Sequence, residues 1–217
     1  MGGFINDKLN IDFINGAVNT IILHLTKCSS TMKADSVKNT NPLKNHEDKI
    51  TNRLVARYLN TEPSGFRYET QTPENFDAET DTFIGRTDIK VLPMSHFCGS
   101  DAYFIIECKR VDGSTDLNRA YVAEGIARFV DYPPKYPSYF KINIIFGYIV
   151  ESFDILSNVS KIEALQTTIL GGLSPSAFTL PRYKDAQYYL FSSKYKSTYI
   201  SCIELKHLFY DFSEVMQ

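Results

Sequence analysis

The segment FIIECKR (residues 104–110) combines the apolar pattern of a buried strand with charged side chains at its end. Because side chains alternate across a strand, Glu107 and Lys109 share one face. Burying a carboxylate and an ammonium costs free energy unless a partner compensates. The pair therefore indicates either an ion pair at the edge of a sheet or part of a metal-centred site.

A second acid, Asp88 in FIGRTDIKV, is expected beside this pair. An antiparallel pairing of 82–92 with 102–111, turning within MSHFCGSD, places Asp88 opposite Glu107. Two carboxylates with Cβ atoms about 5 Å apart repel unless a cation lies between them. A divalent ion that prefers oxygen ligands, above all Mg²⁺, meets this need. Lys109 could then steady an attacking water or the charge that develops on a phosphoryl group.

Glu47 is the third candidate acid. A helix is expected to begin at Asn45 as its N-cap and to run to Leu59. Glu47 continues the apolar stripe of this helix, which consists of Ile50, Leu54 and Tyr58. One possible role of Glu47, as a residue of the first turn, is to stabilise the helix dipole and nothing more. Its inward position fits a metal ligand or a supporting group better.

The order of these residues resembles the PD-(D/E)XK nuclease superfamily, which includes many restriction endonucleases and Holliday-junction resolvases. The matching pattern is Glu47 on a helix, Asp88 on a strand, Glu107-Cys108-Lys109 on the next strand, and then a helix. It covers residues 45–150, about half of the chain. Thr87 stands where the superfamily's name has proline, at a position that varies widely.

The resemblance implies an α/β fold with a restriction-endonuclease-like core, in which helices flank a mixed central β-sheet. It also implies a Mg²⁺-dependent endonuclease, with Mn²⁺ able to substitute, that hydrolyses phosphodiester bonds in DNA during restriction, defence or DNA processing. Asp88, Glu107 and the backbone carbonyl of Cys108 would hold the metal. Glu47 would assist that site, and Lys109 would orient the nucleophile.

The expected helix 116–131 offers further candidates on one face. Tyr121 and Arg128 could reach a substrate phosphate, while Gly125 allows a close approach of the backbone. Alternatively the helix packs on the sheet, Arg128 binds Glu124, and Gly125 eases the packing.

A second basic feature follows the Glu47 helix. Lys49, Arg53 and Arg57 recur every fourth residue and form a ridge. Such a ridge is either a solvated helix face or a track for a nucleic-acid backbone.

Composition sets limits on the partners. Lys and Arg number 23 against 25 Asp and Glu, for a net charge of −2, which argues against a non-specific nucleic-acid coat but not against a local basic cleft. The four cysteines lack zinc-site spacing, as expected in a reducing compartment. The N-terminus has no secretory pattern and the apolar runs are too short for a bilayer. We expect a cytoplasmic protein without membrane contact.

The chain is expected to form a single domain over residues 1–217. An amphipathic helix over 7–27 and a loop over 28–44 precede the catalytic core at 45–150. The apolar stripe of that helix is expected to consist of Leu9, Phe13, Val18, Ile22 and Leu25. The core holds strands near 66–71, 82–92, 102–111 and 141–150. Residues 151–217 add a helix over 158–170 and tyrosine-rich strands near 186–192 and 198–206, which could complete the sheet or form a homodimer interface.

Two other functions remain open at this stage. A catalytically inactive module of the same fold would bind nucleic acid or a protein partner. An ion-paired α/β interaction domain would bind no metal at all.

Overall fold

The computed structural model describes residues 7–94, 102–171, 174–179, 187–196 and 202–217. Within them the strands form one mixed, open sheet in the order β1-β2-β3-β4-β7-β6-β5, with β3, β4 and β7 parallel to one another. The strands are β1 (Phe66–Asp77), β2 (Thr82–Pro93), β3 (Phe104–Val111), β4 (Ile142–Ile149), β5 (Ser174–Pro175), β6 (Tyr188–Lys196) and β7 (Ile203–Asp211).

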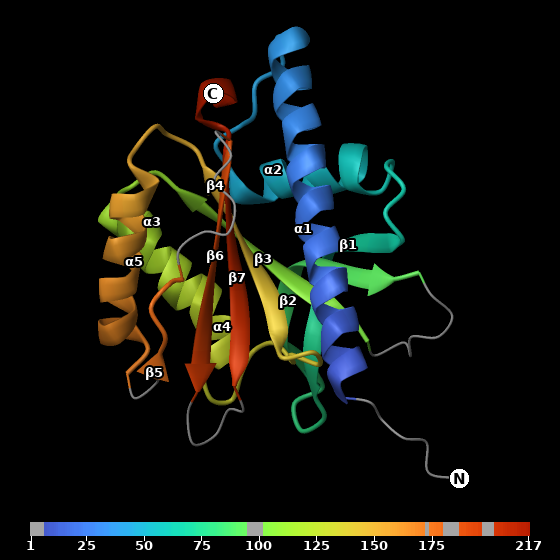
Figure 1. The fold of residues 1–217 in the computed structure, drawn as a ribbon, viewed down its shortest axis with the longest axis vertical. Helices are drawn as coiled ribbons and strands as arrows, with labels where there is room; N and C mark the ends of the chain where they lie inside the picture. Colours follow the sequence, from blue (N-terminus) through green and yellow to red (C-terminus); the bar gives the residue numbers. More distant parts are fainter. Residues whose placement is uncertain (1–6, 95–101, 172–173, 180–186, 197–201) are drawn as a thin grey trace.

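Helices flank both faces of this sheet, as the sequence predicts (Figure 1). One face carries α1 (Asp7–Lys38) and α2 (Glu47–Leu54), which continues as the π-helical η1 (Val55–Leu59). The other face carries α5 (Ile155–Ile169) and a continuous helix made of α3 (Thr115–Ala120), η2 (Tyr121–Ile126) and α4 (Ala127–Val130). The protein therefore has three layers and a core on each side of the sheet.

Strand β4 joins the two cores because both of its faces are buried along its whole length. Ile144 and Phe146 pack toward α1 and α2, whereas Ile145 and Ile149 pack toward the η2 and α5 side. A parallel strand covered on both faces needs a nearly continuous apolar run, which KINIIFGYIV supplies.

Strand β2 pairs with β3 in the predicted antiparallel register, but only over a short stretch. The paired residues are Ile89 with Ile106, Lys90 with Ile105, and Val91 with Phe104. Beyond this stretch β2 continues with β1 as a two-stranded arm (residues 72–87), whose pairing reaches Asp77 and Thr82. Within the described residues, the remainder of β3 consequently has no neighbouring strand on that side.

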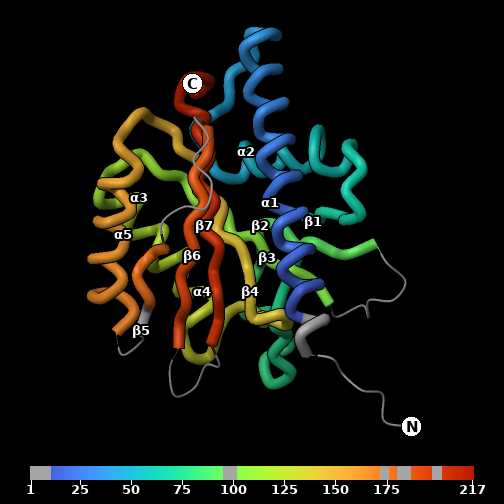
Figure 2. Tube along the Cα trace, viewed as in Figure 1, coloured from blue at the N-terminus to red at the C-terminus, as the bar shows by residue number. Residues whose placement is uncertain are grey.

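The C-terminus lies beside the segment that leads into α2 (Figure 2). The N–H of Leu43 donates to the carbonyl of Val215 at 2.7 Å, and the N–H of Gln217 donates to the carbonyl of Leu43 at 2.8 Å. These contacts between distant parts of the chain fix the start of α2.

Several expected boundaries are wrong. Helix α1 extends to Lys38, well into the predicted loop over 28–44, because Cys28 and Met32 continue its buried stripe among polar residues. The N-cap of α2 is His46 rather than Asn45. Phe13, assigned to the buried stripe, is 56% exposed. The predicted loop over 94–101 lies outside the described residues apart from Met94.

The tyrosine-rich strands complete the sheet, because β7 pairs with β4 and β6 pairs with β7. Their tyrosines Tyr195 and Tyr210 are buried, while Tyr199 lies outside the described residues. In the part of the chain that the structure describes, no helix has the length and apolar character needed to cross a membrane.

Packing around β4 gives a first prediction. A Cβ on Gly147 would overlap the ring of Phe209, so Gly147→Ala should destabilise the fold by about 1–3 kcal/mol in urea denaturation. Gly16→Ala is the matched control, because a Cβ there meets nothing within 4 Å and alanine favours the helix. Equal stability of the two variants would contradict this description of the core.

Candidate functional site at the divergence of two strands

Two carboxylates take the place of the strand that β3 lacks. The Oδ2 atom of Asp88 accepts the backbone N–H of Cys108 at 2.7 Å. The Oε2 atom of Glu47 accepts the backbone N–H of Arg110 at 3.2 Å. A buried N–H without an acceptor costs free energy, so the departure of β2 draws both acids to this edge.

The ammonium of Lys109 lies among the acids. Its Nζ donates to Oε1 of Glu107 at 2.7 Å, to Oε1 of Glu47 at 3.1 Å and to the carbonyl of Cys108 at 2.9 Å. It also lies 4.0 Å from Oδ2 of Asp88. The three protons of an ammonium thus meet three oxygen acceptors. Glu47, Asp88, Glu107 and Lys109 together form what we call the carboxylate cluster.

Glu107 is the most buried member, with no exposed side-chain surface. The Nη1 atom of Arg128 lies 3.0 Å from its Oε1. Its Oε2 lies 2.8 Å from the hydroxyl of Tyr136, which is itself 2.6 Å from the carbonyl of Arg86. A tyrosine hydroxyl has one proton, so a protonated Glu107 can donate to Tyr136 while Tyr136 donates to Arg86.

Burial and charge shift the pKa values of the cluster. Burial, with a further contribution from the charge of Asp88, raises the pKa of Glu107 to about 8 although Lys109 and Arg128 oppose the shift. Burial also raises the pKa of Glu47. Burial lowers the pKa of Lys109, but Glu107, Glu47 and Asp88 raise it by more, so the net shift is upward and the ammonium persists.

The cluster opens into a small polar cleft of about 230 Å³. Its walls come from the start of α2, the arm, the η2–α4 helix and the segment that follows α4. Lining residues are Glu47, Asp48, Ile84, Gly85, Arg86, Asp88, Lys109, Glu124, Arg128, Lys135 and Tyr136. Acidic and basic side chains therefore share the cleft, with the buried Glu107 beneath them.

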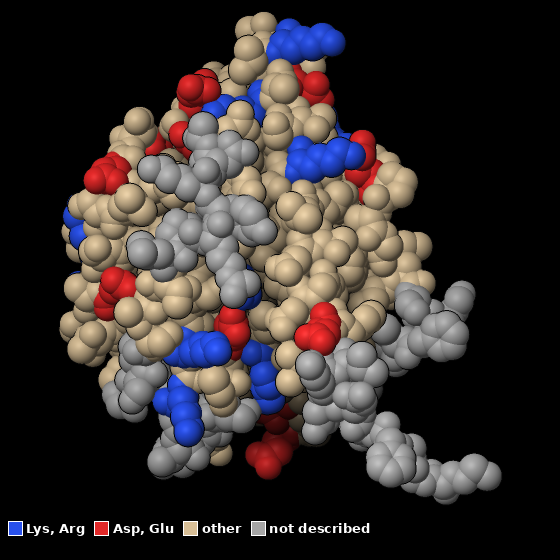
Figure 3. Space-filling model, in the orientation of Figure 1, with Lys and Arg blue, Asp and Glu red and all other residues tan. Residues whose placement is uncertain are grey.

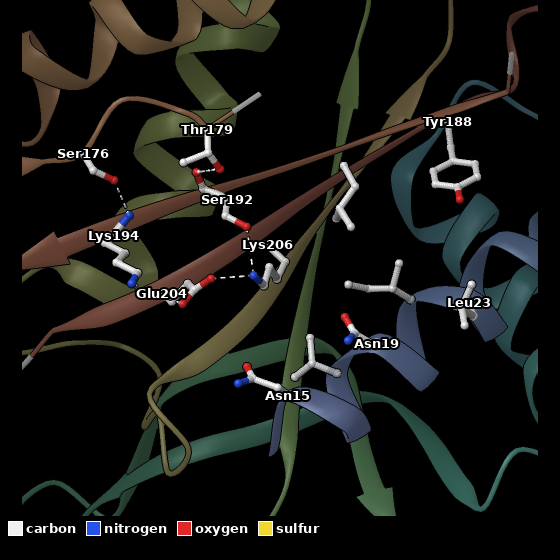
Figure 4. A pocket seen from close by; sticks show the side chains of 13 residues that line it. Asn15, Asn19, Leu23, Ser176, Thr179, Tyr188, Ser192, Lys194, Glu204 and Lys206 are labelled. Carbon is white, nitrogen blue, oxygen red and sulfur yellow. Dashed lines mark hydrogen bonds and ion pairs between the residues drawn. The ribbon is translucent and has the colours of Figure 1, made fainter. Parts of the chain in front are cut away.

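A larger groove of about 860 Å³ lies elsewhere, between α1 and the β6–β7 face of the sheet (Figure 4). Asn15, Asn19 and Leu23 of α1 line one side of it. On the other side Lys206 donates to Glu204 at 2.5 Å and to Ser192 at 2.9 Å. No member of the carboxylate cluster lines this groove, so the smaller cleft is the candidate site.

The structure brings together six of the sequence-predicted site residues: Glu47, Asp88, Glu107, Cys108, Lys109 and Arg128. Arg128 reaches Glu107 and Tyr136 rather than Glu124. Gly125 allows a close approach, since a Cβ there would lie 3.4 Å from Cγ of Lys109.

Tyr121 does not reach the cleft. Its side chain is fully buried, its hydroxyl lies 2.9 Å from Nδ1 of His207, and its ring stacks on Phe209. This position belongs to the core between η2 and the sheet and does not support the predicted phosphate contact. One apolar face of the helix thus packs on the sheet while Arg128 turns toward the site.

The basic ridge also lies away from the cleft lining. Lys49 and Arg57 are exposed, and Arg53 donates to the carbonyls of Asn41 at 3.0 Å and Pro42 at 3.3 Å. Arg53 therefore stabilises the turn before α2. The structure gives no support to a role of the ridge at the site.

Sequence reasoning missed Arg86, Lys135 and Tyr136. Arg86 precedes Asp88 by two positions on the same strand, so simple alternation could have found it. Lys135 and Tyr136 follow two prolines in an irregular segment, where no periodic pattern exists. Tertiary packing alone brings Tyr136 to Glu107 and Lys135 to the wall of the cleft.

The available oxygen donors suit a hard divalent ion, because they comprise three carboxylates and the carbonyl of Cys108. Across the described residues, no group of three His, Cys, Asp or Glu side chains is already arranged to hold an ion. Lys109 occupies the space between the acids, so metal binding would require its ammonium to move aside.

Comparisons of the chain with protein-family models, curated proteins and solved structures find no match. The resemblance to the PD-(D/E)XK superfamily therefore remains a prediction that depends on the motif residues.

The raised pKa of Glu107 predicts how stability changes with pH. Between pH 4.5, the ordinary pKa of a glutamate, and about pH 8, the folded protein keeps a proton on Glu107 that the unfolded chain has released. Stability from this group is therefore present below that window and is lost as the pH rises through it.

The test compares melting temperatures of the metal-free wild type and Glu107→Gln. From about pH 5 to about pH 8 the wild type should lose stability relative to the variant, whose amide cannot ionise. The comparison cancels the contributions of titrating groups whose pKa values do not depend on Glu107, such as His24 and His207. A difference that does not change with pH would contradict a raised pKa.

Proposed function

We propose that this protein is a metal-dependent nuclease of the PD-(D/E)XK type that hydrolyses phosphodiester bonds in DNA. The observation that carries the proposal is the convergence of Glu47, Asp88, Glu107 and Lys109 in a cleft that also presents basic side chains. The order of α2, β2, β3 and the following helix supports a restriction-endonuclease-like core. DNA restriction, defence or processing would be the setting.

Asp88, Glu107 and the carbonyl of Cys108 would hold Mg²⁺, with Glu47 supporting them. The bound ion would act as a Lewis acid toward the phosphoryl oxygens. Lys109, once released from the carboxylates, would orient the attacking water and neutralise developing negative charge. Arg128, which lines the same cleft, would bind the phosphate.

The local charge of the cleft is relevant because the surface as a whole is not basic. On the face seen in Figure 3, the described Lys and Arg side chains alternate with Asp, Glu and much uncharged surface. The net charge is −2. A nucleic-acid strand would therefore be held by Arg86, Arg128 and Lys135, which line the cleft together with Lys109.

One observation favours a second candidate, a non-catalytic module that binds nucleic acid or protein. Each of the three N–H donors of Lys109 already has an acceptor. The carboxylates of Asp88 and Glu47 already accept hydrogen bonds from backbone N–H groups. Such a cluster can be a self-sufficient structural ion network. Metal binding and catalysis distinguish the two functions.

Metal binding is testable without substrate. An ion that binds only the folded state should raise the melting temperature of the wild type, and above its Kd the rise should grow with the logarithm of the ion concentration. Glu107→Gln, which removes one ligand charge, should respond much less. In EDTA at about pH 8 the variant should be at least as stable as the wild type, because it relieves repulsion with Asp88.

A wild type indifferent to Mg²⁺ and Mn²⁺, beside a Glu107→Gln protein clearly weakened in EDTA, would support the structural ion network instead. That result would mean that Lys109 and Arg128 depend on the Glu107 charge for their own burial.

Catalysis is testable with plasmid, linear, single-stranded and RNA substrates in Mg²⁺ or Mn²⁺. Lys109→Ala should reduce cleavage about 100-fold or more, because the charge it neutralises develops in the transition state. Metal binding, read from the shift in melting temperature, should survive. Lys161→Ala, at an exposed position on α5, is the control. If Lys109→Ala cleaves at the wild-type rate, Lys109 has no role in the mechanism.

Phosphate contacts should appear in the salt dependence of DNA binding. Arg86→Gln with Lys135→Gln should flatten the slope of log affinity against log salt by about 2, since each phosphate contact contributes roughly one. Joint replacement of Lys49 and Arg57 is the matched control and should change the slope less. A larger change of slope for the Lys49 and Arg57 variant would instead assign DNA binding to the basic ridge.

A further inference from the structure

The arm carries an exposed aromatic pair near its turn. Phe76 and Phe83 oppose each other in the β1–β2 ladder, with ring centroids 5.3 Å apart. Phe76 and Phe83 are each 55% exposed, and Ile84, which follows Phe83 on the other face of β2, is 46% exposed. Exposed apolar side chains that cluster in this way commonly mark a contact site.

This pair adjoins the cleft. Ile84, Gly85 and Arg86, which follow Phe83 directly, all line it. Since a strand rises by about 3.3 Å per residue, Phe83 lies roughly 10 Å from Arg86 along β2. Phe83 and Arg86 project from opposite faces of β2, because they are three residues apart. The consecutive residues Ile84, Gly85 and Arg86 all line the cleft, so the cleft extends across the edge of β2 that separates the aromatic pair from the cationic group.

The arm is also fixed relative to the site. A Cβ on Gly85 would lie 2.7 Å from the carbonyl of Lys135, which shows how closely the arm packs there. Nδ2 of Asn75 donates to the carbonyl of Pro134 at 3.1 Å. The hydroxyl of Tyr136 lies within hydrogen-bond distance of both Arg86 and Glu107. The aromatic pair therefore has a defined position with respect to the carboxylate cluster.

The turn between the two phenylalanines is acidic. Asp77, Glu79 and Asp81 lie between Phe76 and Phe83, and the intervening segment contains no Lys or Arg. Asp77 accepts from the N–H of Glu79 at 2.9 Å and from Thr80 at 2.8 Å, which holds the turn together. At physiological salt these charges act over about 8 Å, so they repel a phosphate backbone that approaches the turn.

We infer that the cleft and the arm together select an unpaired nucleic-acid strand, with a base stacked on Phe76 and Phe83 and its neighbouring phosphate beside Arg86. The inference rests on the proposed function. Proteins that bind single strands combine a cationic groove for the backbone with aromatic side chains for the bases. The bases of a duplex are paired and unavailable, and its second backbone would approach the acidic turn.

The experiment uses one fluorescent DNA oligonucleotide, alone and annealed to its complement, with fluorescence anisotropy in EDTA so that cleavage does not interfere. The wild type should bind the single strand more tightly than the duplex. Phe76→Leu with Phe83→Leu keeps the apolar character but removes stacking, and should weaken single-strand binding about fivefold or more. Phe13→Leu, at an equally exposed position on α1, should change nothing.

A second variant tests the acidic turn. Glu79→Gln with Asp81→Asn leaves the hydrogen-bonded Asp77 in place and should improve duplex binding more than single-strand binding. An equal effect on the two probes would show a general charge effect and no discrimination by the turn.

The outcomes separate this inference from the proposed function. The inference is overturned if the wild type binds the duplex as tightly as the single strand or more tightly. It is also overturned if the loss of both phenylalanines leaves single-strand affinity unchanged, or if neither probe binds. Light scattering that shows loss of a dimer in the same variant, with unchanged DNA binding, also overturns it, because the pair is then a contact between copies. Failure of metal-dependent cleavage beside intact single-strand binding overturns only the nuclease function.

Discussion

The backbone of β3 beyond its short pairing with β2 imposes the constraint on which the site depends. The N–H groups of Cys108 and Arg110 face an edge without a strand, and a buried edge must find acceptors. Asp88 and Glu47 supply them. This brings two carboxylates next to the fully buried Glu107, and the charges of Lys109 and Arg128 offset the repulsion within the cluster. Replacing part of that compensation by a divalent ion is the chemistry we propose.

The cluster draws its support from distant parts of the chain. Glu47 depends on the start of α2, which is fixed by the C-terminal residues 215–217 and by Arg110, whose Nη1 donates to the carbonyl of Asn45 at 3.0 Å. On the opposite side Tyr136 joins Glu107 to the arm through Arg86. The walls of the cleft therefore hold acidic and basic side chains in defined positions relative to one another.

Much of the fold follows from local patterns. The apolar run of β4, the order of helices and strands, and the register of β2 with β3 were predictable because side-chain alternation and turn position constrain them directly. The extent of α1 was not, because the polar composition of 28–38 suggests a loop until the core is seen to bury Cys28 and Met32. Propensity cannot show which few residues of a polar segment face another helix.

By itself the sequence determined which acids and which lysine meet, since Asp88, Glu107 and Lys109 share neighbouring strands and Glu47 lies on the inward face of its helix. Only the tertiary structure decided the remainder. Tyr121 and Arg128 occupy one helix, yet one enters the core beside His207 and the other contacts Glu107. Tyr136 reaches the cluster from an irregular segment with no repeating pattern. Helical and strand periodicity specify which side chains share a face, whereas the packing of separate elements decides what that face meets.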